Sequence, residues 1–330
     1  MNEVRRSRVG DDGGRVGVLV MAHGTPGTRE EIEPFYTRIR RGNPPSREQL
    51  DDLVRRYDAI GGVSPLAALT RSQVDGLTKL LSTHEPGRYL VRYGAKHTAP
   101  FIEDAALDLV KSGVDETIGL VLTPHYSSAG AGEYLDRAAR AISNSGTSVT
   151  FLPIKEWYEN PAFVDLVASL VTDRIDELRG RGKDHVTTVF SAHSIPMKVA
   201  ESGDPYADQV FESASLVAEV ANLANWRVAF QSAGRTAFPW LSPDLLTTLR
   251  SVAEQGSRAC VVCPIGFVSD HLEILYDVDI EAANTARELG LELCRTESLN
   301  DDPRLLGVLA DVVRATAARR SVHERPGDDR

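Results

Sequence analysis

The chain has 330 residues, 42% of them hydrophobic and 25% charged, which is the balance of a globular protein long enough to form two domains. Its formal net charge of -10 argues against a nucleic-acid partner, because phosphate binding needs concentrated Lys and Arg. No apolar run approaches the length of about 18 residues that a membrane span needs. The stretch Met1–Arg15 is polar and glycine-rich, unlike a signal peptide. We therefore expect a cytoplasmic protein that neither binds nucleic acid nor inserts into a membrane.

Short apolar runs alternate with longer amphipathic ones along the whole chain, which is typical of βαβ units and parallel sheets. Helices are predicted over Ala162–Leu178, Pro205–Ala221, Leu272–Leu289 and Asp302–Ala318. The predicted strands are Val16–Ala22, Tyr89–Gly94, Thr117–Leu122, Val149–Ile154, Thr187–Ser191, Arg227–Gln231, Cys260–Pro264 and Leu291–Arg295. The fold class is therefore α/β, with two similar Rossmann-like, doubly wound lobes, a four-stranded parallel sheet in each, and a cleft between them.

The domain organisation follows from where this alternation is interrupted. The first lobe is expected over 16–155, together with the C-terminal helix at about 302–318, and the second over 156–300. The join falls near Lys155–Pro161, where Trp157, Tyr158 and Asn160-Pro161 break the pattern. We expect 1–15 and 319–330 to be disordered tails, because both are polar and poor in large apolar residues.

The three cysteines are too few for a disulfide framework. Cys260 and Cys263 form a CxxC, but on a strand residues three apart point to opposite faces, so packing is favoured over chelation. Together with Cys294 they cannot supply the four thiolates of an iron–sulfur cluster. The chain also contains no GxGxxG and no GxxxxGK[ST] motif. We therefore expect no iron–sulfur cluster and no organic cofactor.

Two nearly identical motifs place a histidine at the end of a predicted strand, His23 after Ala22 and His193 after Ala192. In open α/β sheets ligands bind just beyond the carboxyl ends of strands. Histidine is well suited to metal binding and to proton transfer near neutral pH. The motifs therefore predict two lobes that face each other across a shared site, although a strand-end histidine can also be a purely structural residue.

An acidic row follows the third strand of the second half. Glu273, Asp277 and Glu281 have the spacing i, i+4, i+8, which stacks them along one face of a helix. A solvated acidic face is the alternative. Glu273, however, comes directly after a strand-to-helix loop on the same sheet edge as His193. A histidine and a carboxylate placed in this way can bind a divalent transition metal or accept protons.

The first half carries a cluster of cationic residues that is unusual in an acidic protein. Arg40 and Arg56 could clamp carboxylates, because the guanidinium fork matches a carboxylate, or they could lie on solvated helix faces. The aromatic residues Tyr57 and Tyr134 could line a flat apolar ligand, although core packing would also account for them.

Several stretches, taken together, resemble the ferrochelatase family, whose members insert ferrous iron into a porphyrin. The resemblance extends from about Val16 to Ala315 and is strongest toward the compact, soluble enzymes of Gram-positive bacteria that act on coproporphyrin III. The matching stretches are Ile60–Leu66, Ser191–Pro196, Gly203–Tyr206, Phe230–Ser232, Pro239–Leu241 and Gly266–Asp277.

The resemblance implies roles for individual residues. His193 and Glu273 match the catalytic and metal-binding pair for Fe²⁺, which is a substrate. Asp277 and Glu281 match a second site for a hydrated cation. His97 matches a histidine that we interpret as structural or supporting. The residues that match the family's porphyrin contacts are Arg40, Arg56, Tyr57, Ser64 and Tyr134. We expect His23 to contact the porphyrin as well, because of its position at the end of the first strand.

His23 departs from the close relatives, which carry a tyrosine at that position that can ligate the iron of the product. An imidazole there would bind ferrous iron well. The Ala-His-Gly sequence also resembles the small chelatases that insert cobalt or iron into sirohydrochlorin.

The resemblance thus predicts a monomeric lyase of haem b biosynthesis that inserts Fe²⁺ into coproporphyrin III to give coproheme. The alternatives are a protoporphyrin IX ferrochelatase, a sirohydrochlorin or cobalt chelatase, and a non-catalytic haem carrier with His23 as axial ligand. The charged stretch Gly27–Glu33 favours a soluble enzyme and coproporphyrin, the more water-soluble porphyrin.

Overall fold

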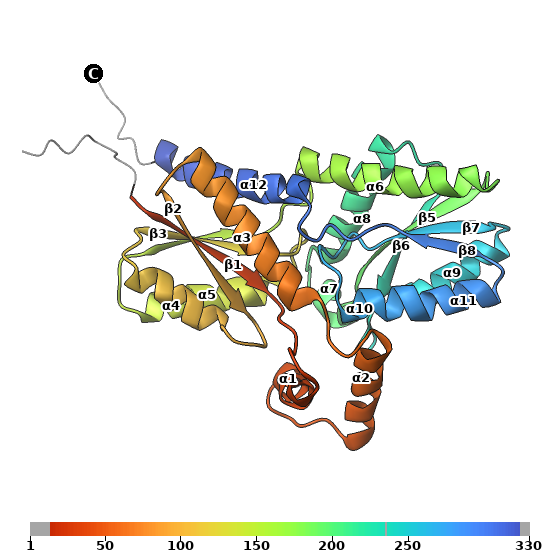
Figure 1. Cartoon of the computed structure of the whole chain (residues 1–330), viewed down its shortest axis with the longest axis horizontal. Helices are drawn as coiled ribbons and strands as arrows, with labels where there is room; N and C mark the ends of the chain where they lie inside the picture. The colour runs from red at the N-terminus through yellow and green to blue at the C-terminus, as the bar shows by residue number, and fades with distance from the viewer. Residues whose placement is uncertain (1–13, 235, 324–330) are drawn as a thin grey trace, which may run out of the picture.

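The computed structural model describes residues 14–234 and 236–323, and these form two lobes, each built on a four-stranded parallel sheet (Figure 1). The strand orders, β2-β1-β3-β4 and β6-β5-β7-β8, repeat one topology. All eight predicted strands form, and their ends shift by at most two residues. The strands are β1 (Val16–Ala22), β2 (Tyr89–Ala95), β3 (Glu116–Val121), β4 (Thr150–Ile154), β5 (Val186–His193), β6 (Trp226–Gln231), β7 (Ala259–Cys263) and β8 (Glu292–Arg295).

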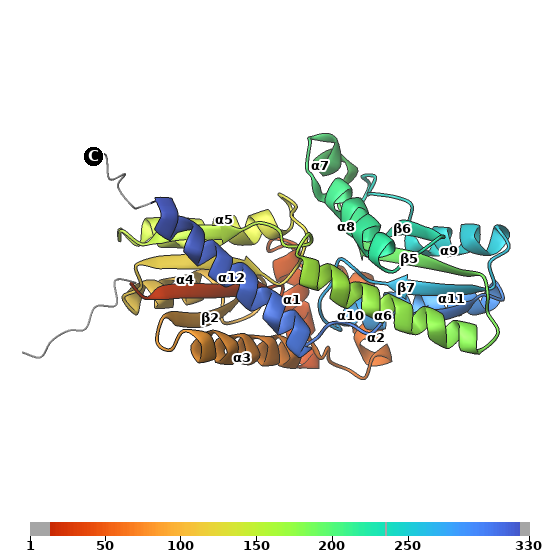
Figure 2. The same ribbon diagram turned by 90° about the horizontal axis from the view of Figure 1, so that it is seen from above.

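Helices cover both faces of the first sheet. Helices α4 and α5 pack together on one face and α3 and α12 on the other, and Figure 2 shows α5 and α3 on opposite sides of the strands. Helices α1 and α2 lie apart from both sheets, below the junction of the lobes in Figure 1. The first-lobe helices are η1 (Arg29–Glu31), α1 (Ile32–Ile39), α2 (Arg47–Ala59), α3 (Leu66–His84), α4 (Ile102–Lys111), α5 (Ala131–Asn144) and the returning α12 (Pro303–His323).

The second sheet is covered in the same way, with α6 packed against α8 and α9 against α11. Between β7 and β8 the chain forms a short α-helix, then a π-helix, then a second α-helix. The helices of this lobe are α6 (Pro161–Gly180), α7 (Met197–Glu201), α8 (Tyr206–Val220), α9 (Leu245–Glu254), α10 (Leu272–Leu275), the π-helix η2 (Asp277–Ala282) and α11 (Ala283–Glu288).

Local sequence sets several of the helix starts. At α6 the Asn160 side chain accepts hydrogen bonds from the N–H groups of Ala162 and Phe163, and Pro161 occupies the first helical position. At α2 Ser46 and Gln49 form a reciprocal capping box. These side chains satisfy backbone donors that a helix cannot satisfy itself.

Alternation along the strands divides each lobe into two cores. In β7 Cys260 packs into the core beneath α9 and α11, whereas Cys263 lies in the core on the opposite face. Both cysteines are buried and free. The predicted packing role of the CxxC is therefore confirmed, because the strand period of two directs the thiols to opposite sides of the sheet.

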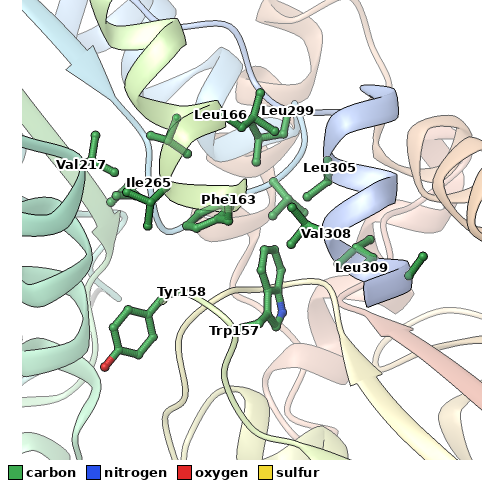
Figure 3. Close-up of a cluster of buried hydrophobic side chains, with 14 of the residues drawn as sticks. Trp157, Tyr158, Phe163, Leu166, Val217, Ile265, Leu299, Leu305, Val308 and Leu309 are labelled. Atoms are coloured by element: carbon green, nitrogen blue, oxygen red, sulfur yellow. The ribbon is translucent and has the colours of Figure 1, made fainter. Parts of the chain in front are cut away.

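One hydrophobic core is shared by both lobes. Trp157 and Phe163, at the crossing from β4 to α6, meet Leu305 and Val308 of α12 in this cluster, which Figure 3 shows. The same cluster includes one face of each sheet, and α12 also packs on α3, β3 and β4. The lobes are therefore joined by continuous apolar packing as well as by the chain itself.

Two predicted segments differ from the structure. The helix predicted over Leu272–Leu289 is interrupted by η2, where the N–H of Glu281 donates to the carbonyl of Tyr276 in the i+5 pattern of a π-helix. Helix α12 continues to His323 instead of ending at Ala318, because residues with high helix propensity follow Ala318 directly. The rest of the two predicted tails, 1–13 and 324–330, lies outside the described residues.

The shared core leads to a stability prediction. Phe163 is 1% exposed, so we expect Phe163→Ala to lower the free energy of unfolding by about 3–5 kcal/mol in urea denaturation, through lost burial and a cavity. Phe211 is 57% exposed and serves as the matched control, for which we expect about 1 kcal/mol or less. Equal losses in the two variants would contradict the assigned core.

Candidate active site

His23 directly follows β1 and His193 is the last residue of β5, and these two strands occupy the same position in the two sheets. Ligands of doubly wound sheets bind at this point, where the strand order reverses. The loop after β7 approaches β5 closely at Gly266, where an added Cβ would lie 2.7 Å from the Ala192 Cβ. Only glycine permits this approach, which brings the loop carrying Glu273 to His193.

Glu273 lies between two histidines. Its Oε1 is 3.5 Å from Nε2 of His193, and its Oε2 is 3.5 Å from Nε2 of His271. The Nδ1 atoms of His193 and His271 contact the carbonyls of Ser194 and Ser269. These contacts assign a proton to each Nδ1 and direct both Nε2 atoms toward the carboxylate.

The electrostatics of this group favour an ion pair. Desolvation lowers the pKa of His193, but the charge and hydrogen bond of Glu273 outweigh it and raise the pKa to about 9. Desolvation raises the pKa of Glu273, yet His193 and His271 hold it well below its ordinary value. The pair therefore retains one proton at neutral pH, on the imidazole of His193.

Gln231 fixes the backbone beneath this pair. It is buried at the end of β6, accepts a hydrogen bond from Ser191 Oγ at 2.8 Å, and donates to the Glu273 carbonyl at 3.0 Å. The start of α10 is thereby tied to the edge of the second sheet.

Asp277 is 7% exposed and links the two lobes. Its Oδ1 is 3.3 Å from Nη1 of Arg56 in α2, and its Oδ2 accepts a hydrogen bond from Ser232 at 2.5 Å. Desolvation raises its pKa, the Ser232 bond opposes this, and the charge of Glu273 adds to it, giving about 6. A carboxyl group with this pKa changes protonation close to neutral pH.

The acidic row does not form one uniform helix face. The prediction assumed an α-helix through Glu273, Asp277 and Glu281, but η2 begins at Asp277. Asp277 is buried, whereas Glu281 is exposed. The negative charge of Glu281 still contributes to the raised pKa of Asp277, so the two carboxylates remain near each other.

His23 provides the first-lobe counterpart of His193. Its ring remains accessible to solvent, but the protein around it lowers its pKa to about 4 by desolvation, which the charge of Glu273 partly offsets. Its Nδ1 contacts the Gly24 carbonyl at 3.2 Å, and its ring centroid is 4.7 Å from that of His97. His23 is therefore a neutral imidazole at physiological pH.

The charge of Glu273 also contributes to the raised pKa of two tyrosines of the first lobe. Desolvation raises the pKa of Tyr57 to about 12, the Thr25 bond opposes this, and the Glu273 charge adds to it. Burial and then nearby carboxylates, Glu273 among them, raise the pKa of Tyr134. The Lys96 ammonium lies 4.9 Å from the Tyr134 ring centroid. Residues from both lobes thus converge on one carboxylate.

Arg40 and Ser64 make local contacts instead. Arg40 follows α1, donates to the Asn43 carbonyl at 3.2 Å and stacks on Tyr36. Ser64 accepts a hydrogen bond from the N–H of Leu66 at the start of α3. Their predicted contacts with a porphyrin stay predictions.

The sequence patterns gave no role to His271, Gln231 or Ser232. The position of His271, two residues before Glu273 in the same strand-to-helix loop, was a usable signal, because both side chains then start from one sheet edge. Gln231 and Ser232 stand at the carboxyl end of β6, the edge that already carries His193.

Within the described ranges, no group of three or more His, Cys, Asp or Glu side chains is arranged to hold a metal ion. Over the same ranges, no helix has both the length and the apolarity to cross a bilayer.

Comparison with solved structures defines the class of protein. SirB from Bacillus subtilis with Fe³⁺ matches with a TM-score of 0.60, 13% identity, and coverage of 93% of this chain and 97% of that one. The sirohydrochlorin chelatase SirB from Bacillus subtilis subspecies spizizenii, in complex with cobalt, matches with a TM-score of 0.57 at 13% identity, covering 92% of this chain and 96% of that chain. The fold is that of the chelatases.

Sequence comparison identifies the family. The ferrochelatase family model matches residues 15–317. The ferrochelatase of Herpetosiphon aurantiacus is 42% identical over 91% of this chain and 98% of that relative. The coproporphyrin III ferrochelatase of Halalkalibacterium halodurans is 41% identical over 93% and 98%, and that of Geobacillus thermodenitrificans 42% over 90% and 95%. The chain belongs to the ferrochelatase family.

The His193–Glu273 pair makes stability depend on pH. A histidine whose pKa is raised on folding stabilises the protein fully below its unfolded pKa of about 6.5, and this contribution is lost as pH rises through about 9. We expect the difference in free energy of unfolding between wild type and His193→Gln to be largest near pH 6 and to shrink toward about pH 10.

The exposed His185 supplies the control, because His185→Gln should leave the pH dependence of unfolding unchanged. The measurement is urea denaturation at several pH values. A His193→Gln difference that stays constant with pH would rule out the ion pair.

Proposed function

We propose that this protein inserts Fe²⁺ into coproporphyrin III, giving iron coproporphyrin III (coproheme) for haem b synthesis, as a lyase. The names of several relatives at about 40% identity support this substrate. The observation that carries the proposal is the convergence on Glu273. Its carboxylate lies between His193 and His271 of the second lobe, and its charge shifts the pKa of His23 and Tyr57 of the first.

The porphyrin ring would lie with His193 and Glu273 on one face and His23 on the other. Tyr57 and Tyr134 are 2% and 8% exposed, so they would support the ring mainly through their packing beneath the surface and touch it only at their edges. The propionates of the porphyrin would be held by Arg40, Arg56 and Ser64, and the Arg56 guanidinium would be shared between a propionate and its partners Asp52 and Asp277. Fixing the ring in this way supplies the positional part of the rate enhancement.

Metal insertion requires Fe²⁺ to lose water and the macrocycle to lose two pyrrole protons. His193 and Glu273 offer one nitrogen and one carboxylate oxygen to the iron, which is an acceptable set for ferrous ion. Binding at His193 requires its proton to leave, so iron affinity and proton release are coupled.

Asp277 is suited to move those protons, because its pKa of about 6 lets it take up and release a proton near neutral pH. It is buried beside Glu273, while the exposed Glu281 continues the path toward solvent. The same two carboxylates would hold the second, hydrated cation. His23 keeps a free Nε2 lone pair on the opposite face and would ligate the iron of the product.

The surface around the first helix favours coproporphyrin over protoporphyrin. The stretch Gly27–Glu33, which contains η1, is charged, and Arg29 pairs with Asp58 of α2. A charged surface at this position suits an enzyme that takes its substrate from water, and coproporphyrin is the more water-soluble of the two porphyrins. A cytoplasmic location and a monomeric state remain predictions.

The catalytic pair is tested by His193→Ala and Glu273→Gln. We expect each to lower the turnover number for Fe²⁺ insertion by about 100-fold or more, because metal binding and proton transfer both pass through the pair. Coproporphyrin binding, followed by fluorescence quenching, should be retained within a few-fold.

His185→Ala, at an exposed position of the second lobe, is the matched control. Wild-type turnover in either site variant removes that residue from the chemistry. Tight haem binding by wild type without any metal-dependent loss of porphyrin fluorescence would favour the haem-carrier alternative.

The substrate is tested by measuring kcat/KM for coproporphyrin III, protoporphyrin IX and sirohydrochlorin side by side. We expect coproporphyrin to be preferred by about tenfold or more, since each additional charge-assisted hydrogen bond contributes about 1.5–3 kcal/mol. Arg40→Leu should reduce that preference, whereas Arg47→Leu, 95% exposed on α2, should not. Preference for protoporphyrin, or for sirohydrochlorin, would replace the proposed substrate.

A further inference from the structure

Asn300 occupies an unusual position between β8 and α12, where the chain passes from the second lobe back to the first. It has a φ of +47°, in the left-handed region that side chains seldom adopt. It lies in the turn that the N–H of Asp302 closes by donating to the Leu299 carbonyl at 2.9 Å, and asparagine adopts this conformation more readily than most side chains. The contacts that its side chain makes beyond this turn are therefore its distinguishing feature.

Asn300 holds the backbone on both sides of Ser269. Its N–H donates to the Val268 carbonyl at 2.7 Å, and its side-chain oxygen accepts from the N–H of Asp270 at 2.9 Å. Its side-chain amide also donates to the Asp270 carboxylate at 3.0 Å. These three bonds fix a segment that begins five residues before Glu273.

Gln73 ties this arrangement to the first lobe. It lies on α3, is 1% exposed, and its side-chain Nε2 donates to the Asn300 carbonyl at 2.6 Å and to Ser269 Oγ at 2.9 Å. A buried amide that bridges two segments of the opposite lobe fixes their separation, because losing either bond would leave a buried polar group unpaired.

The segment fixed in this way orients a histidine of the site. The Ser269 carbonyl contacts Nδ1 of His271 at 2.9 Å, which leaves His271 Nε2 facing the Glu273 carboxylate at 3.5 Å. Outer hydrogen bonds of this kind set the tautomer and the ring orientation of a histidine. A continuous chain of contacts therefore leads from α3 through Ser269 to Glu273.

The Asp270 carboxylate extends the same network to the π-helix. It accepts a hydrogen bond from Ser298 and lies 3.3 Å from Arg295, whose guanidinium donates to both carboxylate oxygens of Asp279 in η2. The segments on both sides of Glu273 are thereby held by groups connected to Asn300.

We propose that Gln73 and Asn300 form a latch between the lobes that positions His271 and Glu273 for metal insertion. Asn300 is a positioning residue, because it acts on the carboxylate through Ser269 and His271. The proposal rests on the proposed function and adds to it a route by which the seating of the first lobe controls the geometry of the metal-binding carboxylate.

The test compares Asn300→Gly with Asn222→Gly in the full-length enzyme. Glycine keeps the left-handed backbone accessible and removes only the side chain. Asn222 has a φ of +50° in an exposed turn after α8 and is the matched control. We expect Asn300→Gly to lower kcat for Fe²⁺ insertion by about 10- to 100-fold, as outer-shell changes at metal sites do, with the Kd for coproporphyrin III within about twofold of wild type. Asn222→Gly should leave both unchanged.

A spectroscopic measurement accompanies the kinetics. The ¹⁵N chemical shift of His271 Nδ1 reports its hydrogen bond to the Ser269 carbonyl, so Asn300→Gly should move this shift away from the wild-type value. Should Asn300→Gly fail to fold, Gln73→Met removes the bridging donor at nearly the same volume and should produce the same two changes. The double swap D270N/N300D restores the donor–acceptor pair between these two side chains. It should therefore recover part of the kcat that N300D alone loses.

Unchanged kcat and unchanged His271 shifts in Asn300→Gly would overturn the latch. Equal reductions of kcat and of porphyrin binding would assign Asn300 a purely structural role and would also overturn it. A wild-type protein that inserts no iron would defeat the proposed function alone, because the histidine shifts test the latch without turnover.

Discussion

The ionised carboxylate of Glu273, partly withdrawn from water between two imidazoles, is the constraint on which the site depends. A carboxylate in such surroundings is costly unless cations and hydrogen-bond donors compensate it. His193 and His271 supply that compensation at 3.5 Å each. Two further residues bring these partners together. Gly266 allows the loop to approach β5, and Gln231 fixes the backbone of α10.

The position of Glu273 matters only if the first lobe is held in place. The core around Phe163 and α12 joins the lobes without directional contacts, so it sets their approach but not the register of individual side chains. Directional bonds supply that register, namely Arg56 to Asp277 and Gln73 to Asn300. Apolar packing thus sets how closely the two lobes approach, and a small number of polar links set which side chains meet between them.

Much of this could be predicted from the sequence, because strand alternation and strand-end motifs are local signals. The apolar runs over 16–22 and 187–191 predicted both strands, the motifs that follow these runs predicted the placement of His23 and His193, and the strand-to-helix loop after the third strand of the second half pointed to Glu273. The π-helix, the burial of Asp277 and the link from Gln73 to Asn300 could not be predicted in this way. They depend on contacts between distant segments, separated by 227 residues for Gln73 and Asn300, and no periodicity encodes such contacts.

The two strand-end histidines illustrate how one motif acquires two chemistries. His193 lies beside a carboxylate, and its pKa rises to about 9. His23 occupies the equivalent strand end, where desolvation lowers its pKa to about 4 although the charge of Glu273 opposes this. One histidine therefore carries a proton at neutral pH and the other keeps a free lone pair. Since β1 and β5 are topologically equivalent, this difference arises from the surroundings of each histidine, and it leaves the two faces of the site with imidazoles in different protonation states.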